Sequence, residues 1–474
     1  MSDGPERDPE LSDDDFDWFL VIEPHPDMVL PDDGPVPLGP FLDAEPRLRE
    51  IVATVPTAER LFGLSTRLEW DALLGRVSGA CGAAPVADLH RVLRVAIRHE
   101  PAARQLARDI TPNDQVLYYG VVTEDRGAKS PPPRTRPLQT RSDLLGNNDP
   151  YIGFQSYLLG GKFNPKKKPP GAPGLRADKV WRLPGGLGQG AHVTLVEGGW
   201  TVGPPASTGA HPLVQHQDLS ARVPLIHGHV GGTADISHGM ATLGVLAAEP
   251  ENGVGLRGLV PRATLQVVSK FNNNQVSNSH AALVHAVKHT PRGGIVVLAM
   301  ENKRGHIPLE RDKHIAAALR LARSLCVTVV TAFGNGGREQ NTAFGWTTQP
   351  ASPLLAGNDN GAIRVAAVVP KTGKKLAKSN YGHGVSAHSW GDKVTSFSST
   401  QYTLGYSHTS AATALVAGAA ALVQALWLKK TPTPLTPLSP RVLRALLYDT
   451  GSPSATGTDQ IGRQPNVYKA YKAF

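Results

Sequence analysis

Three residues whose types can perform nucleophilic catalysis stand at the ends of predicted regular elements. Glu197 ends an apolar run and precedes two glycines, His238 opens a small-residue stretch with helical spacing, and Ser410 precedes a long Ala-rich stretch. A serine hydroxyl is a poor nucleophile at neutral pH, so it needs a nearby base and a carboxylate that orients that base. The three residues therefore predict a Ser-His-Glu triad that attacks an acyl carbon.

Asn335 is the candidate for stabilising the charge that such an attack creates. It follows a β-branched apolar run, 326–333, which predicts a buried parallel strand that ends in a Gly-rich loop. A side-chain amide at that place can donate to an oxyanion, and losing such a donor costs about 3–4 kcal/mol of transition-state stabilisation. The backbone N–H of Ser410 is the predicted second donor, because it lies at a helix N-terminus.

Each of these residues has a simpler interpretation when it is taken alone. Glu197 would be a solvated strand end, Ser410 a helix N-cap and Asn335 a turn residue. Their joint occurrence in one order, each beside glycine or another small residue, favours catalysis over these separate interpretations.

The elements that must position these residues alternate in type from residue 180 onward. Strand-like and helical patterns follow one another at 191–197, 238–248, 263–269, 280–289, 294–301, 311–325, 326–333, 362–369, 409–428 and 440–449. This alternation predicts an α/β fold, in which a parallel sheet has helices on both faces.

The candidate residues also lie within a series of longer motifs. These are 193–199 around the acid, 216–219, 238–244 around the base, 255–261, 332–335 at the oxyanion position, 379–382, and 408–418 around the nucleophile. In sequence and order they resemble the subtilisin-like serine peptidases, the subtilase or S8 family, over about 180–474. The resemblance implies a subtilisin-like fold and a serine endopeptidase with Glu197, His238 and Ser410 as its catalytic residues, Asn335 in its oxyanion hole, and no required cofactor.

The chain departs from the family pattern near the candidate site. Glu197 stands where the family has Asp, a form similar to a bacterial branch that carries Glu there, and His408 replaces a Gly beside which substrate passes. The segment 298–302 stands near the place of the family's substrate-edge Ser-Leu-Gly. The resemblance implies substrate binding by Glu301, Gly334 and His408, and a carboxylate at a cleft rim predicts a preference for basic substrate residues. The alternative for Glu301 is that it ends a strand and faces water.

Composition divides the chain into four predicted regions. Residues 1–45 hold 14 acidic side chains and one basic side chain, which predicts a disordered acidic arm. Residues 46–125 predict a mostly helical or α+β, propeptide-like extension, because apolar residues recur three and four positions apart over 46–110 and 115–122 is strand-like. Residues 126–175 are rich in Pro and Lys and predict an exposed linker, most cleavable at 166–168, and residues 176–474 form the catalytic domain.

Charge and hydropathy narrow the range of partners. The formal net charge is +9, and residues 46–474 carry 48 basic against 26 acidic side chains. No Lys/Arg run is interleaved with aromatic residues, which argues against a nucleic acid as partner. No apolar run reaches the about 18–20 residues of a membrane span, so a membrane partner is not expected. The expected partner is a protein or peptide substrate, and docking of the acidic arm on the basic body is an open alternative.

Two further predictions concern redox state and location. Cys81 and Cys326 are far apart in sequence, and Cys326 falls in a predicted core strand, so free thiols are expected. The acidic N-terminus lacks the basic start and apolar core of a secretory signal. Both observations favour a cytoplasmic protein, with secretion by a non-standard route left open.

Metal binding receives little support from the sequence. His227, His229 and His238 match no zinc-ligand spacing, and no cysteine lies near them, so no metal site is predicted. Asp218 matches a position that binds calcium in some relatives, but the corresponding loop 249–253 looks rearranged, so calcium is only weakly supported.

Two rival functions remain open at this stage. The departures at Glu197 and His408 allow a catalytically weak or inactive binding or scaffold protein with the same fold. The basic body allows a nucleic-acid-binding protein, whose affinity would fall with salt.

Overall fold

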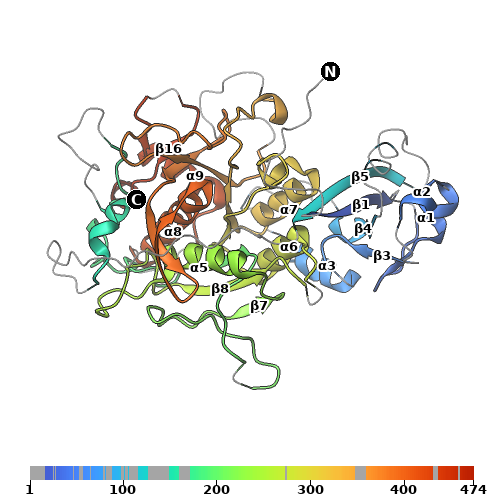
Figure 1. Cartoon of the computed structure of the whole chain (residues 1–474), viewed down its shortest axis with the longest axis horizontal. Coiled ribbons are helices and arrows are strands. Elements are labelled where there is room, and N and C mark those ends of the chain that lie inside the picture. The colour runs from blue at the N-terminus through green and yellow to red at the C-terminus, as the bar shows by residue number, and fades with distance from the viewer. Residues whose placement is uncertain are drawn as a thin grey trace.

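A large sheet with helices on both faces carries the candidate residues in the computed structural model, and a smaller antiparallel sheet stands beside it (Figure 1). The structure describes residues 16–125 with gaps (chiefly 53–56, 78–80, 82–87 and 98–115), then 149–159, 171–346, 359–430 and 436–474, except 206, 273–274 and 457–458. The large sheet is the frame on which the candidate site is built.

The large sheet has the strand order β15-β16-β12-β11-β10-β9-β6-β8-β7. Neighbouring strands from β12 to β7 are parallel, which confirms the α/β prediction. The strands are β6 (His192–Glu197), β7 (Leu225–His227), β8 (Thr264–Ser269), β9 (Ile295–Leu298), β10 (Thr328–Ala332), β11 (Ile363–Val368), β12 (Ala387–Trp390), β15 (Ser452–Pro453) and β16 (Arg463–Gln464), and β13 (Val394–Ser398) pairs with β14 (Gln401–Tyr406) outside this sheet.

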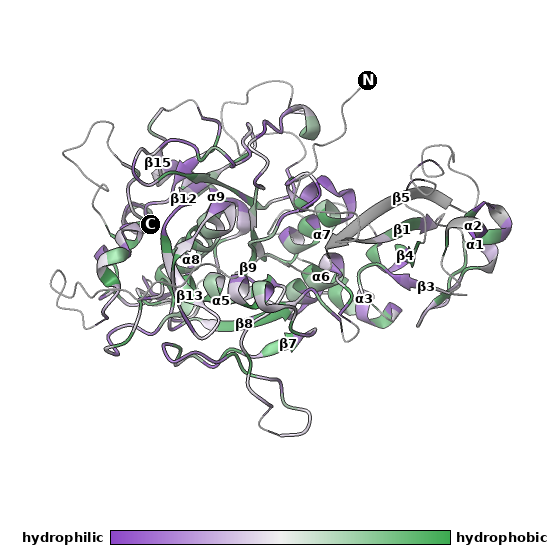
Figure 2. Ribbon diagram, viewed as in Figure 1, coloured by the Kyte–Doolittle hydropathy of each residue, from purple (hydrophilic) through white to green (hydrophobic). Residues whose placement is uncertain are grey.

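Alternate residues of the central strands face two different hydrophobic cores. In β6, Val193 and Leu195 belong to one core and Val196 to the other. A period of two is that of a strand, and covering both faces makes the strand apolar throughout. The first core contains residues of α5 (Thr233–Ala247) and α8 (His408–Lys430). The second core contains residues of α6 (Ser279–His289) and α7 (Lys313–Ser324). The remaining helices of the domain are α9 (Pro440–Thr450) and α10 (Val467–Lys472). Figure 2 shows that α7 carries both hydrophilic and hydrophobic residues, as a helix with one buried face should.

The helix α8 runs through the interior of the main domain. By length and composition it could cross a membrane, which corrects the expectation that no apolar run is long enough, but 89% of its apolar window is buried inside the protein. Small residues dominate it because its neighbours lie close. A Cβ added at Gly418 would come within 2.4 Å of Leu259 Cδ1. These features are those of a core helix.

The N-terminal module is an antiparallel sheet with short helices, which corrects the prediction of a mostly helical extension and agrees with the α+β alternative and its strand at 115–122. Residues 89–97 have helix-like apolar spacing, but they form a 3-10 turn followed by β4, in which Leu93, Arg94 and Val95 are all buried. Burial on both faces removes the alternation by which a strand is recognised. The elements are β1 (Phe16–Pro24), β2 (Val36–Pro37), β3 (Thr57–Arg60), β4 (Leu93–Ala96), β5 (Val116–Asp125), α1 (Gly39–Ala44), α2 (Leu48–Ile51) and α3 (Arg67–Leu74), with sheet order β2-β3-β4-β1-β5.

The predicted region boundaries before residue 176 also need correction. Strand β1 lies between β4 and β5 and buries Phe19 to Ile22, so residues 16–45 contain folded elements and not the expected disordered arm. The segment 149–159, predicted as linker, contributes to the main hydrophobic core. The prolines at 131–133 and the lysines at 166–168, on which the linker prediction depends, lie outside the described residues.

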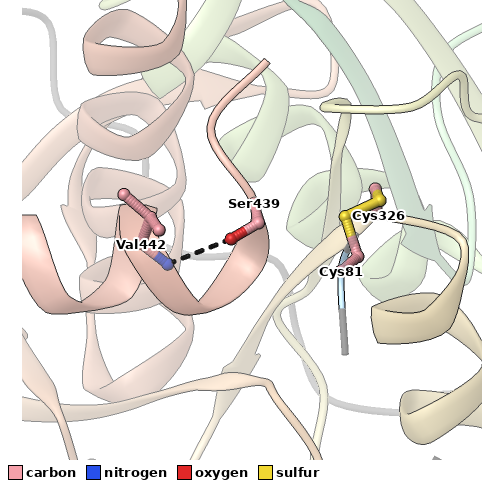
Figure 3. Close-up of a disulfide and its surroundings, with 4 residues drawn as sticks. All are labelled: Cys81, Cys326, Ser439 and Val442. Atoms are coloured by element: carbon pink, nitrogen blue, oxygen red, sulfur yellow. Dashed lines mark hydrogen bonds between the residues drawn. A yellow bond between two sulfur atoms is a disulfide. The ribbon is translucent and has the colours of Figure 1, made fainter. Parts of the chain in front are cut away.

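A disulfide joins the N-terminal module to the main domain, which corrects the prediction of two free thiols. The Cα atoms of Cys81 and Cys326 are 5.4 Å apart, a usual separation for a disulfide, although 245 residues separate them in sequence. Figure 3 shows the bond, with the N-cap of α9 in the same view, where the Ser439 hydroxyl accepts from the Val442 N–H. The position of Cys326 in a buried strand-like run suggested that no second cysteine could reach it, but the N-terminal module places Cys81 next to it.

The module packs against α6 and α7 through an apolar contact with ion pairs around it. Glu23 accepts from Lys313 Nζ at 3.0 Å and contacts His314 Nε2 at 2.8 Å, and Lys288 Nζ donates to Glu69 at 2.8 Å. The module contributes to the shared hydrophobic core with Val21, Leu61, Phe62, Leu64, Trp70, Leu73, Leu89 and Val92. The N-terminal module is therefore attached by a covalent bond, by ion pairs and by apolar burial.

Candidate active site

The carboxyl ends of the parallel strands bring the four predicted residues to one cavity. Glu197 is the last residue of β6, Asn335 lies three residues beyond β10, and His238 and Ser410 lie in the N-terminal halves of α5 and α8. All four line a cavity of about 370 Å³. In open α/β sheets, ligands bind outside the carboxyl ends of the strands. Segments that are far apart in sequence therefore meet where such a fold places a ligand.

Glu197 and His238 form the acid–base pair that the sequence predicts. Glu197 Oε2 lies 3.0 Å from His238 Nδ1, and the side chains are 4% and 37% exposed respectively. Burial of the imidazole lowers the pKa of His238, but the charge of Glu197 and the hydrogen bond to it outweigh this, so the pKa lies above its ordinary value. Because Nδ1 serves the carboxylate, Nε2 is the nitrogen that can act as a base.

The Ser410 hydroxyl donates to the backbone carbonyl of Ala299 at 2.8 Å. Its single hydrogen is therefore directed to a carbonyl and not to His238 in this state. Catalytic hydrogen bonds often form only when substrate is present. Before it can attack, the hydroxyl must break its hydrogen bond to the Ala299 carbonyl and donate to the imidazole of His238.

Asn335 is oriented by the residue that precedes the nucleophile. Its Oδ1 accepts from Thr409 N at 3.0 Å and from Thr409 Oγ1 at 2.8 Å. A backbone N–H can only donate, so this end of the amide must be the oxygen. The amide NH₂ group is thus the end that can donate to a substrate oxygen, as an oxyanion hole requires.

Of the three residues expected to bind substrate, Glu301 and His408 line the cavity and Gly334 does not. Glu301 Oε2 accepts from Asn335 N at 2.6 Å, and Oε1 lies 2.8 Å from His306 Nδ1. Both carboxylate oxygens therefore have partners inside the protein, and a basic substrate residue would compete with them. Gly334 has φ +89°, and a Cβ there would lie 2.6 Å from His306 O, so its glycine is required by local packing.

His408 adopts the left-handed backbone conformation, with φ +66°. Glycine reaches this region without a steric penalty, whereas other residues experience strain of about 1–2 kcal/mol. The family's Gly at this position is thus explained by the backbone as well as by substrate access. The His408 N–H donates to Gly391 O at 2.7 Å, which helps to hold the turn, and burial lowers the pKa of the imidazole.

Two residues that the sequence analysis missed complete the surroundings of Glu197. Thr242 Oγ1 donates to Glu197 Oε1 at 3.0 Å and lies 2.8 Å from Tyr406 Oη. Two sequence signals could have found them. Thr242 follows His238 by four residues, so the two lie on the same face of the helix. Tyr406 precedes Ser410 by four residues. A polar residue at the first of these positions is a simple signal for a partner of the acid.

The buried carboxyl of Asp218 has only N–H donors as its hydrogen-bond partners in the structure. Its Oδ1 accepts from Asn252 Nδ2 at 2.9 Å and its Oδ2 from Leu256 N at 2.7 Å. Burial, with smaller contributions from Asp149 and Glu249, raises its pKa to about 7. A calcium ion at this carboxyl would have to share or displace these two donors.

Three histidines outside the proposed triad stack on one another. His227 stacks on His285, which stacks on His289, with ring centroids 4.1 Å apart in both pairs. Stacked rings do not direct their nitrogens to a common point. Within the described part of the chain, no group of three or more His, Cys, Asp or Glu is arranged to hold a metal ion.

Comparison with known proteins places this chain in a family. The model of the subtilase family, Peptidase S8, matches residues 229–464. Thermitase from Thermoactinomyces vulgaris is 26% identical over 336 residues, which cover 68% of this chain and 98% of thermitase. The chain belongs to the subtilase family and is a subtilisin-like serine peptidase.

Two solved structures illustrate the range of the similarity. A protease from Pseudoalteromonas arctica is 19% identical, with a TM-score of 0.49, and the match covers 69% of this chain and 99% of that protein. A cold-adapted subtilisin-like serine proteinase is 16% identical, with a TM-score of 0.41, and the match covers 60% of this chain and 90% of that protein.

Proposed function

We propose that the chain is a serine endopeptidase with a Ser410-His238-Glu197 triad and Asn335 in the oxyanion hole. The observation that carries the proposal is the 3.0 Å contact between Glu197 Oε2 and His238 Nδ1, in a cavity that Ser410 and Asn335 also line. In this family the acid is usually Asp, so the specific proposal is that Glu197 performs its role.

The proposed reaction proceeds through an acyl-enzyme. Ser410 Oγ attacks the carbonyl carbon of a peptide bond, and its proton passes to His238 Nε2. The Asn335 amide and the Ser410 N–H stabilise the resulting oxyanion, while Glu197 orients His238 and stabilises its charged form. His238 then gives the proton to the leaving amine, and water releases the acyl group by the same route. No cofactor takes part.

A fluorophosphonate probe with the purified full chain tests the proposal. An activated serine is labelled, and Ser410→Ala abolishes labelling if Ser410 is that serine. His238→Ala should also nearly abolish labelling and peptide hydrolysis, because triad members act as a unit. Labelling or turnover at the wild-type level in either variant would contradict the assignment.

The second candidate is an inactive binding protein with the same fold, favoured by the hydrogen bond from Ser410 to the Ala299 carbonyl. A serine held permanently in that bond would not attack. Absence of labelling in the wild-type chain, together with a folded circular-dichroism spectrum, would support this candidate over the peptidase.

We also propose that the Asp218 loop is held by hydrogen bonds and not by calcium. Its two oxygens accept from Asn252 and Leu256, which are the partners a bound ion would have to displace. A chelator is therefore expected to leave the melting temperature and peptide hydrolysis unchanged. A fall in melting temperature that added calcium restores would show that the loop binds the ion.

A further inference from the structure

Both oxygens of the Glu197 carboxylate have a specific partner. Oε2 faces His238 Nδ1 and Oε1 accepts from Thr242 Oγ1, each at 3.0 Å. Glu197 is 3% exposed and Thr242 is fully buried, so water does not compete for these contacts. A buried carboxylate bonded at both ends has one orientation available to it.

Counting hydrogens gives the direction of the bonds around Thr242. Its hydroxyl has three possible partners, namely Glu197 Oε1, the His238 carbonyl at 3.1 Å and Tyr406 Oη at 2.8 Å. The one hydroxyl hydrogen goes to the carboxylate, because hydrogen bonds to a charged acceptor are the stronger ones. Tyr406 must then be the donor to Thr242.

The location of Tyr406 supports this direction. Burial and the charge of Glu197 raise the pKa of Tyr406 well above its ordinary value, so its hydroxyl keeps the proton that it donates. Its ring also packs edge-on against His238, with ring centroids 5.6 Å apart. Tyr406 ends β14, two residues before α8 begins with the segment that carries Ser410.

Glu has one more rotatable bond than Asp, and the position of its carboxylate is correspondingly less determined. The family's usual acid needs less external restraint for this reason. A donor from the helix of the base and a second donor behind it provide that restraint in this chain.

We infer that Thr242 and Tyr406 are positioning residues, which hold the Glu197 carboxylate against His238 through a chain of hydrogen bonds from Tyr406 to Thr242 to Glu197. This inference rests on the proposed Ser-His-Glu triad. It assigns no contact with substrate to either residue.

Thr242→Val tests the inference, because it removes the hydroxyl and keeps the shape. We expect kcat for peptide hydrolysis to fall about 10- to 100-fold with KM little changed. The apparent pKa of kcat/KM on the acid side should also fall, because a loosened carboxylate raises the pKa of His238 less. Thr242→Ser keeps the hydroxyl and should restore most of both quantities.

Tyr406→Phe should lower kcat less, by about 3- to 10-fold, and should have little further effect in the Thr242→Val background. Thr328→Val is the matched control, because Thr328 is a fully buried threonine of the same domain whose hydroxyl has no hydrogen-bond partner among the described residues. It should keep wild-type kcat and the wild-type pH profile.

The outcomes separate this inference from the proposed function. An inactive, unlabelled wild-type chain would refute the triad itself. An active wild type with an unchanged kcat and pH profile in Thr242→Val would refute only the positioning role. Equal impairment in Thr242→Ser and Thr242→Val would also overturn it, since shape and not the hydroxyl would then matter. Independent effects of the Thr242 and Tyr406 substitutions would exclude Tyr406 from the chain of bonds.

Discussion

At the scale of single residues, this site depends on how a carboxylate one methylene longer than usual is accommodated. Glu197 is the last residue of β6, and two glycines follow it. Gly198 lets the backbone pass close to the side chain of Asp235, because a Cβ at Gly198 would lie 2.4 Å from Asp235 Oδ1. The carboxylate still reaches His238 Nδ1 at 3.0 Å. The site is therefore built for the length of Glu.

Substitutions of Glu197 test this fit. Glu197→Gln should lower kcat by about 10²- to 10⁴-fold, because a neutral amide can favour the wrong imidazole tautomer. Glu197→Asp should also impair hydrolysis, since its shorter side chain cannot reach both His238 and Thr242. Steady-state kinetics with one peptide substrate measures both effects. Wild-type activity in Glu197→Asp would show that the carboxylate is not positioned as described.

The pH dependence of hydrolysis follows from the environment of His238. In the proposed mechanism its neutral form is the general base, and the pKa of His238 lies above its ordinary value because the attraction of Glu197 outweighs the effect of burial. Activity should therefore be lost as the pH falls through a value above about 6.5, the ordinary pKa of histidine. A kcat/KM profile with an acid limb at or below that value would contradict this prediction.

At the scale of elements, the sequence predicted the main domain better than the N-terminal module. Strands such as β6 and β10 are short, mostly apolar runs that are buried except at His192 and are soon followed by glycine, and each was predicted within about two residues. In the module, β4 was mistaken for helix because both of its faces are buried. Short-range patterns cannot distinguish these cases, since the contacts that bury the second face are distant in sequence, as in the hydrogen bond from Arg94 to Ser277 O.

The start of α8 allows a direct test of backbone strain. At most positions Gly is less stable than Ala by about 0.5–1 kcal/mol, but His408 has φ +66°, where Ala is strained and Gly is not. His408→Gly should therefore be more stable to denaturant than His408→Ala by about 1 kcal/mol. Equal stability, or the usual order with Ala above Gly, would show that the turn relaxes when the imidazole is removed.

At the scale of the whole molecule, the covalent link between module and main domain is the feature that the sequence could not supply. Nothing in the sequence relates Cys81 to Cys326, since the contact depends on how the module packs against α6 and α7. By contrast, each proposed triad residue could be picked out from a local motif, and the structure brings all three to one cavity. The spacing of Thr242 from His238 and of Tyr406 from Ser410 could have marked both residues as candidates, but their contacts with Glu197 and with each other depend on how different elements pack.

The disulfide also bears on the predicted location. The expectation of a cytoplasmic protein rested partly on free thiols, and that part of its basis is lost, since disulfides persist mainly in oxidising compartments. Cytoplasmic location stays a prediction. Immunodetection in fractionated cells tests this prediction. Recovery of the protein only outside the cytoplasmic fraction would contradict it.

The link has a topological consequence for any cleavage between the module and the main domain. The bond joins Cys81 to Cys326, so a cut anywhere between them leaves two fragments joined by the disulfide. A specific protease site inserted after Lys168 provides such a cut.

On a denaturing gel, the treated protein should run near its full mass of 50.4 kDa without reductant and as two fragments with reductant. The variant Cys81→Ser should give two fragments in both conditions. Separation of the cut wild-type chain without reductant would show that the two cysteines are not bonded.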